Sequence, residues 1–158
     1  MSVIETYLFD WGDTLMIDFP GVPGKMCDWD VVEMVEGAQE VLSCLSKSAE
    51  IYIATGAVES TEKEIAQAFA RVGLSQYITG YFCKANTGLT KGTSQFLEHI
   101  LEKLGKPVAN VAMVGDSLKK DIEPAAAIGI KPIWVTSLKS NEAPENTLVI
   151  PRLRELCM

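Results

Sequence analysis

The sequence predicts an α/β fold in which one doubly wound parallel sheet of five strands carries helices on both faces. Short apolar runs, typical of strands buried on both sides, alternate along the chain with segments whose apolar residues recur at helical spacing. Such alternation favours right-handed βαβ units and therefore a parallel sheet. Polar residues follow several of the apolar runs directly, and the carboxyl ends of strands are where open α/β sheets place their ligands.

Five apolar runs are predicted to be the strands of this sheet. The first run leads into Asp10, the second ends at Thr55, and the fourth ends at Gly115. Pro132 lies in the fifth run, and because proline has no backbone N–H we expect that strand near an edge of the sheet. The predicted strands cover residues 6–9, 50–54, 77–83, 108–114 and 130–135.

The predicted helices lie between these strands, and several have recognisable ends. Thr61 and Glu64 form the pattern of a capping box. Thr93 and Ser117 are candidate N-caps, and Pro124 is tolerated only in the first turn of the helix that follows Ser117. The helices are expected around residues 35–45, from Thr61 to Gly73, from Thr93 to Gly105 and from Ser117 to Gly129, with a short one near Leu153.

The length of 158 residues, with 47% hydrophobic and 22% charged residues, predicts a single globular domain over residues 1–158. A net charge of −7 argues against nucleic acid and anionic membrane as partners, because both attract basic surfaces. No basic segment followed by an apolar stretch is visible at the N-terminus, and no run approaches the length of a membrane span. We therefore expect a cytoplasmic protein.

The four cysteines, at positions 27, 44, 83 and 157, are widely spaced and form no CxxC pair. A zinc site or a thioredoxin-like redox pair is therefore not expected. Cys44 and Cys83 lie in apolar patterns and are predicted to be buried thiols, in keeping with a reducing compartment. The single histidine, His99, lies in a helical pattern and cannot supply both a catalytic triad and a metal site.

Residues 10–14, Asp-Trp-Gly-Asp-Thr, resemble the first motif of haloacid dehalogenase-like (HAD) hydrolases, in which a buried strand ends in Asp-x-Asp-x-Thr. Thr55-Gly56, Lys91 and Gly115 with its following Asp116 then match the order of that family's other three motifs, across nearly the whole chain. The resemblance implies a Rossmann-like sheet with strand order 5-4-1-2-3. It also implies an enzyme of the phosphohydrolase (phosphatase) type with Mg²⁺ as its cofactor.

The resemblance assigns roles to individual residues. Asp10 would be the nucleophile that forms an aspartyl-phosphate intermediate. Thr55 and the amide of Gly56 would bind phosphate oxygens, and Lys91 would neutralise both the nucleophile and the transferring phosphoryl group. Two alternative interpretations remain. In the first, the hydroxyl of Thr55 only hydrogen-bonds within its own turn, and in the second, Lys91 is a solvated surface residue.

The resemblance also implies a metal site. Asp10, the backbone carbonyl of Gly12 and Asp116 would hold Mg²⁺, a cation that prefers oxygen ligands. Asp121 matches the second acidic position of the fourth motif and would act through water or by orienting Lys91. Its alternative role is that of an acidic residue favoured at a helix N-terminus.

The chain departs from the family pattern at Gly12, where the motif has the aspartate that serves as general acid/base. Asp13, one residue later, is the candidate replacement. In a strand, Asp10 and residue 12 would share a face and Asp13 would point away, but the turn after the strand breaks this phase. Two alternatives therefore stay open: a non-catalytic phosphate-binding or protein-interaction module that lost its acid, and a dehalogenase or phosphonatase.

No cap domain is predicted. Residues 16–31 are rich in glycine and proline, which indicates a loop and not a folded insertion. This loop is a candidate lid, although its Trp29 is equally expected to pack on the core. Because small ligands need most of their surface buried, an uncapped site predicts as partner a phosphorylated macromolecule, or a phosphorylated small molecule closed over by the loop or by a second subunit of a homo-oligomer.

Overall fold

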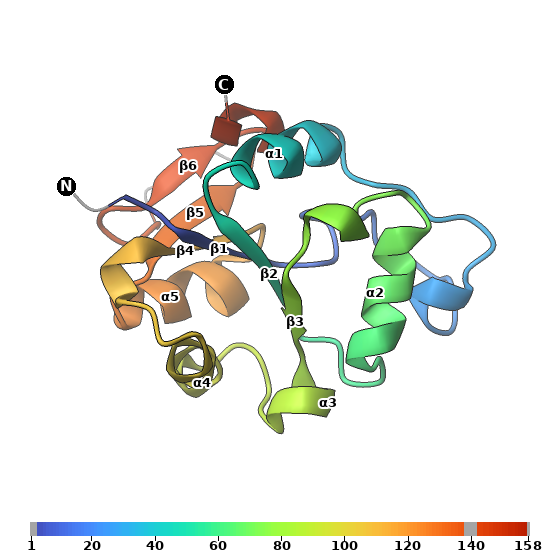
Figure 1. Ribbon diagram of the computed structural model, residues 1–158, viewed down its shortest axis with the longest axis horizontal. Coiled ribbons are helices and arrows are strands. Elements are labelled where there is room, and N and C mark those ends of the chain that lie inside the picture. Colours follow the sequence, from blue (N-terminus) through green and yellow to red (C-terminus); the bar gives the residue numbers. More distant parts are fainter. Residues whose placement is uncertain (1–2, 138–141, 158) are drawn as a thin grey trace.

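The computed structural model describes residues 3–137 and 142–157. This part of the chain forms one parallel sheet of six strands in the order β3-β2-β1-β4-β5-β6 (Figure 1). The order of the first five strands is the predicted one, and β6 is an addition that the sequence did not indicate. The strands are β1 (Thr6–Phe9), β2 (Glu50–Ala54), β3 (Gly80–Phe82), β4 (Val111–Gly115), β5 (Lys131–Val135) and β6 (Leu148–Ile150).

Five α-helices and several short turns of other helical types connect the strands in this described part. The α-helices are α1 (Ala38–Leu45), α2 (Glu62–Ala70), α3 (Lys84–Thr87), α4 (Ser94–Leu104) and α5 (Glu123–Ala127). Turns of 3₁₀ type cover Met26–Asp28, Ser75–Tyr77, Val108–Asn110 and Leu153–Cys157, and a wider π-type turn covers Leu118–Ile122.

The two faces of the sheet carry two separate buried clusters. Leu8 of β1 belongs to the cluster that contains Phe96 of α4, and its neighbour Phe9 belongs to the cluster that contains Leu42 of α1 and Phe69 of α2. Successive residues of a strand point to opposite faces, so one short strand supplies both clusters. Figure 1 shows α4 and α5 together on one side of the sheet and α1 on the other, which is the predicted doubly wound arrangement without a cap domain.

The register of the central strands determines where the polar residues that follow them lie. Phe9 of β1 is paired with Ile53 of β2 and with Val114 of β4. The amide of Asp10 still donates to the carbonyl of Val114, at 2.9 Å. The three strands therefore end side by side, and the residues that follow them meet at one edge of the sheet.

Several predicted boundaries shift for local reasons. Helix α1 begins only at Ala38, because Gly37 at its N-cap has φ of 86° and separates the helix from Val35. The capping box of Thr61 and Glu64 is confirmed. Thr93 holds the N-cap position of α4 but its side chain makes no capping hydrogen bond, so that part of the prediction is wrong.

The prediction that β5 lies near an edge is confirmed, but β5 is not the edge strand itself, because β6 pairs with it in parallel. The ladder between them begins at Ile133, so Pro132 lies outside it. Pro132 is paired only with Met113 of β4. The missing N–H of the proline therefore removes no hydrogen bond of the β5–β6 ladder.

Cys44 of α1 and Cys157 near the C-terminus form a disulfide, with their Cα atoms 6.4 Å apart. This corrects the prediction that Cys44 is a buried thiol, whereas Cys83 is free and fully buried as expected. Disulfides are typical of oxidising compartments and rare in a reducing cytoplasm. The disulfide therefore does not support the expected cytoplasmic location, which stays a prediction. Among the described residues, no helix has the length and apolar character needed to cross a membrane.

Candidate active site

The predicted site residues Asp10, Lys91 and Asp121 are joined by ion pairs at the carboxyl edge of the sheet. The ammonium nitrogen of Lys91 lies 2.7 Å from Oδ1 of Asp10 and 2.5 Å from Oδ1 of Asp121. The side chains of Lys91 and Asp121 are 4% and 0% exposed, so this is a buried ionic cluster and not a surface lysine. Such a cluster is costly unless its charges are paired, which argues for a dedicated role.

Asp121 reaches Lys91 because the neighbouring strand end is a glycine. A Cβ on Gly115 would collide with the carboxylate of Asp121, so only glycine fits at this position. The amide of Ser117 donates to Oδ2 of Asp121 at 3.1 Å, and the hydroxyl of Ser117 accepts from the amide of Lys120 as the predicted N-cap. The turn that follows β4 thereby directs a buried carboxylate back toward the strand ends.

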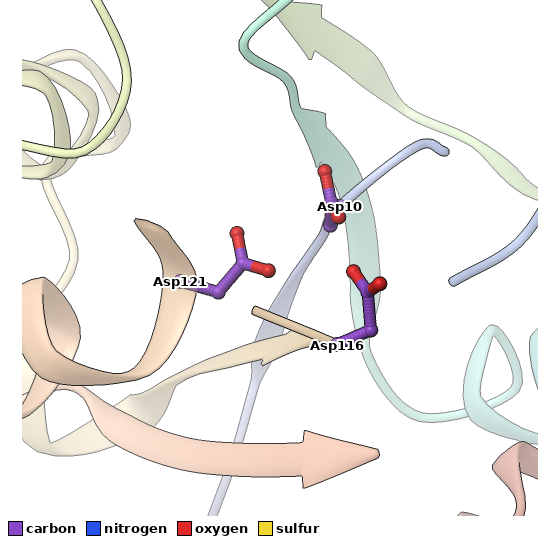
Figure 2. A group of neighbouring side chains, drawn as sticks. All are labelled: Asp10, Asp116 and Asp121. Carbon is purple, nitrogen blue, oxygen red and sulfur yellow. The ribbon is translucent and has the colours of Figure 1, made fainter. Parts of the chain in front are cut away.

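Thr14 joins the first and fourth motifs. Its buried hydroxyl lies 3.3 Å from Oδ2 of Asp10 and 3.3 Å from Oδ1 of Asp116, and it is shared between the two carboxylates as donor. The indole N–H of Trp134 on β5 donates to the backbone carbonyl of Asp116 at 3.0 Å. Figure 2 shows Asp10, Asp116 and Asp121 on three separate segments, with the carboxylate of Asp121 pointing toward the other two.

Asp10, Asp116 and Asp121 each place a carboxylate oxygen within 4.8 Å of the others. Asp116 is exposed overall, but partial burial of its carboxyl group, a hydrogen bond with Asp10 and the charges of Asp10 and Asp121 raise its pKa to about 7. Burial likewise raises the pKa of Asp121 to about 6, although Lys91 opposes the shift. Three carboxylates facing one ammonium group leave excess negative charge, and a hard divalent cation with oxygen ligands fits this donor set.

The pKa of Lys91 reflects the same cluster. Burial alone would lower it, but the charges of Asp10 and Asp121 outweigh that effect and raise the pKa above its ordinary value. Lys91 is therefore a permanent cation at neutral pH. It is placed to balance the charge of Asp10 and of any anion bound beside it.

Thr55 and Gly56 form the second wall of the site. Thr55 is 4% exposed, and its hydroxyl oxygen accepts a hydrogen bond of 3.1 Å from the amide of Ala57. The hydroxyl can still donate its own hydrogen to an anion. Gly56 packs against the aliphatic stem of Lys91, where an added Cβ would lie 3.5 Å from the Cβ of the lysine.

These residues line a cavity of about 500 Å³. Asp10, Gly12, Thr55, Gly56, Lys91, Asp116 and Asp121 are all at its surface, so the structure brings together every predicted site residue except Asp13. The loop of residues 16–31 supplies a further wall through Asp18, Gly24, Lys25, Met26 and Trp29.

The loop is attached to α2 and to the core. Trp29 is 8% exposed and belongs to the main buried cluster, which confirms the alternative in which it packs on the core. Arg71, which follows α2, donates to the backbone carbonyls of Cys27 and Trp29, and Lys25 forms an ion pair of 2.7 Å with Glu64 of α2. The loop therefore forms one wall of the cavity in this structure, and its role as a lid stays a prediction.

Asp13 is exposed, has φ of 59° and is not among the residues of the cavity surface. Its Oδ1 accepts a hydrogen bond of 3.0 Å from the amide of Asp18. Asp18, which sequence reasoning did not single out as a catalytic group, does reach the cavity. No motif or spacing marks it, because its position depends on the turn that follows Asp13.

A family model described as haloacid dehalogenase-like hydrolase matches residues 13–129. The chain therefore belongs to the haloacid dehalogenase-like hydrolase family, and the resemblance noted from its motifs is confirmed. Among curated proteins it is 26% identical to the HAD-hydrolase YfnB of Bacillus subtilis over 128 residues. That match covers 78% of this chain and 53% of YfnB, so the chain spans about half the length of this relative.

Solved structures show the same fold at low sequence identity. An uncharacterized protein from Listeria monocytogenes serotype 4b superposes with a TM-score of 0.83 at 18% identity, covering 97% of this chain and 94% of that one. The magnesium-bound structure of B. subtilis YfnB gives 0.77 at 16% identity, with 98% and 97% covered. A HAD phosphatase from Thermococcus onnurineus gives 0.75 at 17% identity, with 97% and 96% covered.

Proposed function

We propose that this protein is a Mg²⁺-dependent phosphatase that hydrolyses phosphate monoesters through an aspartyl-phosphate at Asp10. The observation that carries the proposal is the contact of Lys91 with Asp10, at 2.7 Å, on the surface of a cavity of about 500 Å³. A carboxylate held beside a buried cation is suited to approach an anionic substrate that it would otherwise repel. The magnesium in the YfnB structure and the phosphatase from T. onnurineus support the same assignment.

In the first step, an oxygen of Asp10 forms a bond to phosphorus as the bond to the leaving oxygen breaks. Lys91 and the hydroxyl of Thr55 bind the phosphoryl oxygens and stabilise their charge. In the second step, water attacks the aspartyl-phosphate, which releases phosphate and restores the carboxylate. Mg²⁺, when held by Asp10, Asp116 and Asp121, supplies positive charge that offsets the phosphoryl group.

The size of the cavity supports a proposal for the class of substrate. A volume of about 500 Å³ lies within the roughly 300–1,000 Å³ typical of small-molecule sites. Since the loop of residues 16–31 already forms one wall, a phosphorylated small molecule fits better than a phosphorylated macromolecule. The proposal does not require a second subunit, and a homo-oligomer stays a prediction, as do the exclusion of nucleic acid and membrane partners.

The test combines the purified protein with p-nitrophenyl phosphate or acetyl phosphate, in Mg²⁺ or in EDTA. We expect Mg²⁺-dependent release of phosphate by the wild type and none by Asp10→Asn, because the amide is nearly isosteric but is not a nucleophile. Acid quenching should trap a hydroxylamine-sensitive phosphoryl group on the wild type only. Asp10→Asn with wild-type activity would exclude Asp10 as the nucleophile.

One observation favours a second candidate, a phosphate-binding module without catalysis, because Gly12 stands where the family has its acid. Such a module would bind inorganic phosphate or vanadate in calorimetry and would release no product from any phosphate ester. Halide release without a metal requirement would instead identify a dehalogenase.

A further inference from the structure

The space beside Gly12 is filled by the side chain of Asp18. A Cβ built on Gly12 would lie 3.4 Å from the Cβ of Asp18 and 3.7 Å from its Oδ2. These are the nearest neighbours of that position. The side chain of Asp18, its carboxylate included, therefore lies in van der Waals contact with the position that a Cβ at residue 12 would take.

The backbone holds Asp18 in this place. Its amide donates to Oδ1 of Asp13 at 3.0 Å, and the preceding residue, Ile17, donates its amide to the carbonyl of Glu33 at 2.9 Å. Asp13 adopts the left-handed conformation with φ of 59°, which turns the chain after the strand and returns Asp18 toward Gly12. Asp13 is thus a positioning residue for Asp18.

Asp18, which is exposed like Asp13, also lies at the surface of the candidate active site. It lines the same cavity as Asp10 and Lys91, whereas Asp13 does not. A proton donor must come within hydrogen-bond reach of the leaving oxygen, and only a group at the cavity surface can do so. Of the two carboxylates that follow Gly12 in the turn, the placement selects Asp18.

We propose that Asp18 is the general acid/base that replaces the missing aspartate at residue 12. The inference rests on the proposed phosphatase function. As the bond between phosphorus and the leaving oxygen breaks, the carboxyl proton of Asp18 passes to that oxygen and an alcohol departs. When water then attacks the phosphoryl group on Asp10, one water proton returns to Asp18, so the cycle ends with the group as it began.

The test compares Asp18→Asn with Asp30→Asn, an exposed acid of the same loop that does not line the cavity. The substrates are p-nitrophenyl phosphate, whose phenolate leaves without a proton, and glycerol 3-phosphate, whose alkoxide does not. For Asp18→Asn we expect a burst of about one equivalent of p-nitrophenol, slow turnover afterwards and a trapped phosphoryl group on Asp10. With glycerol 3-phosphate its rate should fall about 10²–10⁴-fold, without a burst.

Asp30→Asn should behave as the wild type with both substrates. The inference is overturned if Asp18→Asn matches Asp30→Asn in both rates and traps no more phosphoenzyme. It is equally overturned if Asp18→Asn shows no burst with p-nitrophenyl phosphate, because formation of the phosphoenzyme from an aryl ester needs no acid. Wild-type protein that forms no phosphoenzyme and hydrolyses neither substrate would instead refute the proposed function, and the inference with it.

Discussion

The carboxylate of Asp121 occupies the space in which a side chain at Gly115 would stand. This places a buried acid at the end of β4, where it pairs with Lys91 at 2.5 Å. The Gly115→Ala substitution should push Asp121 away from the lysine and lower the free energy of unfolding by about 1–3 kcal/mol, the usual cost of overpacking. Denaturant titration measures the loss, and the Mg²⁺-dependent hydrolysis rate should fall with it.

A double-mutant cycle isolates the cause. Asp121→Gly removes all the side-chain atoms that a Cβ at residue 115 would meet, so Gly115→Ala should cost less in that background. Equal costs in both backgrounds would show that the two positions do not interact.

Replacing Lys91 with methionine tests the buried ionic cluster. Lys91→Met removes the only ammonium group paired with Asp10 and Asp121 among the described residues and leaves two carboxylates without their partner. Breaking a buried pair from one side typically costs about 3–5 kcal/mol. We expect a loss of that order in chemical denaturation and no detectable turnover. Lys103→Met, at an exposed lysine of α4, is the matched control and should change neither.

The raised pKa of Asp116, about 7, predicts how pH affects the metal. Between about pH 4 and 7 the folded protein without metal holds a proton that the unfolded chain has released, so this group makes the free energy of unfolding fall as pH rises. Mg²⁺ must displace that proton. Its stabilising effect on the melting temperature should therefore be larger at about pH 8 than at about pH 5.5.

The Asp116→Asn variant should show a smaller Mg²⁺ effect that no longer grows as pH rises through about 7. Glu102→Gln, at an exposed acid of α4, is the control and should retain the wild-type behaviour. A Mg²⁺ effect that is equal at both pH values in the wild type would contradict the placement of the metal at Asp116.

The disulfide between Cys44 and Cys157 fastens the C-terminal turn to α1. Cys44→Ser should lower the free energy of unfolding in non-reducing buffer by about 2–4 kcal/mol, because the unfolded chain loses its crosslink. Adding a reductant should lower the wild type to the same value and leave the variant unchanged. Cys27→Ser, at a free cysteine, should match the wild type, and a reductant effect on Cys44→Ser would point to another cause.

The sequence predicted the parts of the fold that depend on local patterns. The second strand was predicted at its observed bounds because the apolar run of residues 51–54 stands between the polar residues Glu50 and Thr55. The meeting of Asp10 and Thr55 could be predicted because each directly follows an apolar run, and the carboxyl ends of parallel strands lie at one edge of the sheet. Strand β6 was missed because Leu148–Ile150 is too short to show a period, and it exists through pairing with β5.

The unpredicted features depend on contacts between distant residues or on backbone conformation. Cys44 and Cys157 are separated by 113 residues, and no spacing rule pairs them. Asp18 lies beside Gly12 only because Asp13 adopts a left-handed conformation, which few residues other than glycine do readily. The alternation of side chains that a strand imposes ends where the strand ends. The role of Asp18, which follows the turn, could therefore not be assigned from the sequence.

The last prediction concerns the Gly12→Asp substitution, which returns the family's aspartate to its usual place. In the wild type the new side chain would meet Asp18, whose Cβ lies 3.4 Å from the added Cβ, and two nearby carboxylates raise the pKa of one another. We therefore expect little gain or a loss in the wild-type background. In Asp18→Asn the same substitution should restore glycerol 3-phosphate hydrolysis by at least about tenfold, since it again supplies an acid.

The control for this rescue is Gly12→Ala in the Asp18→Asn background, which adds the Cβ without the carboxylate. It should restore nothing, and the burst with p-nitrophenyl phosphate should persist in it while disappearing in the variant with aspartate. Rescue by alanine as well as by aspartate would mean that space, and not a proton, limits Asp18→Asn. A tenfold gain in glycerol 3-phosphate hydrolysis from Gly12→Asp in the wild type would mean that Asp18 does not act as the general acid.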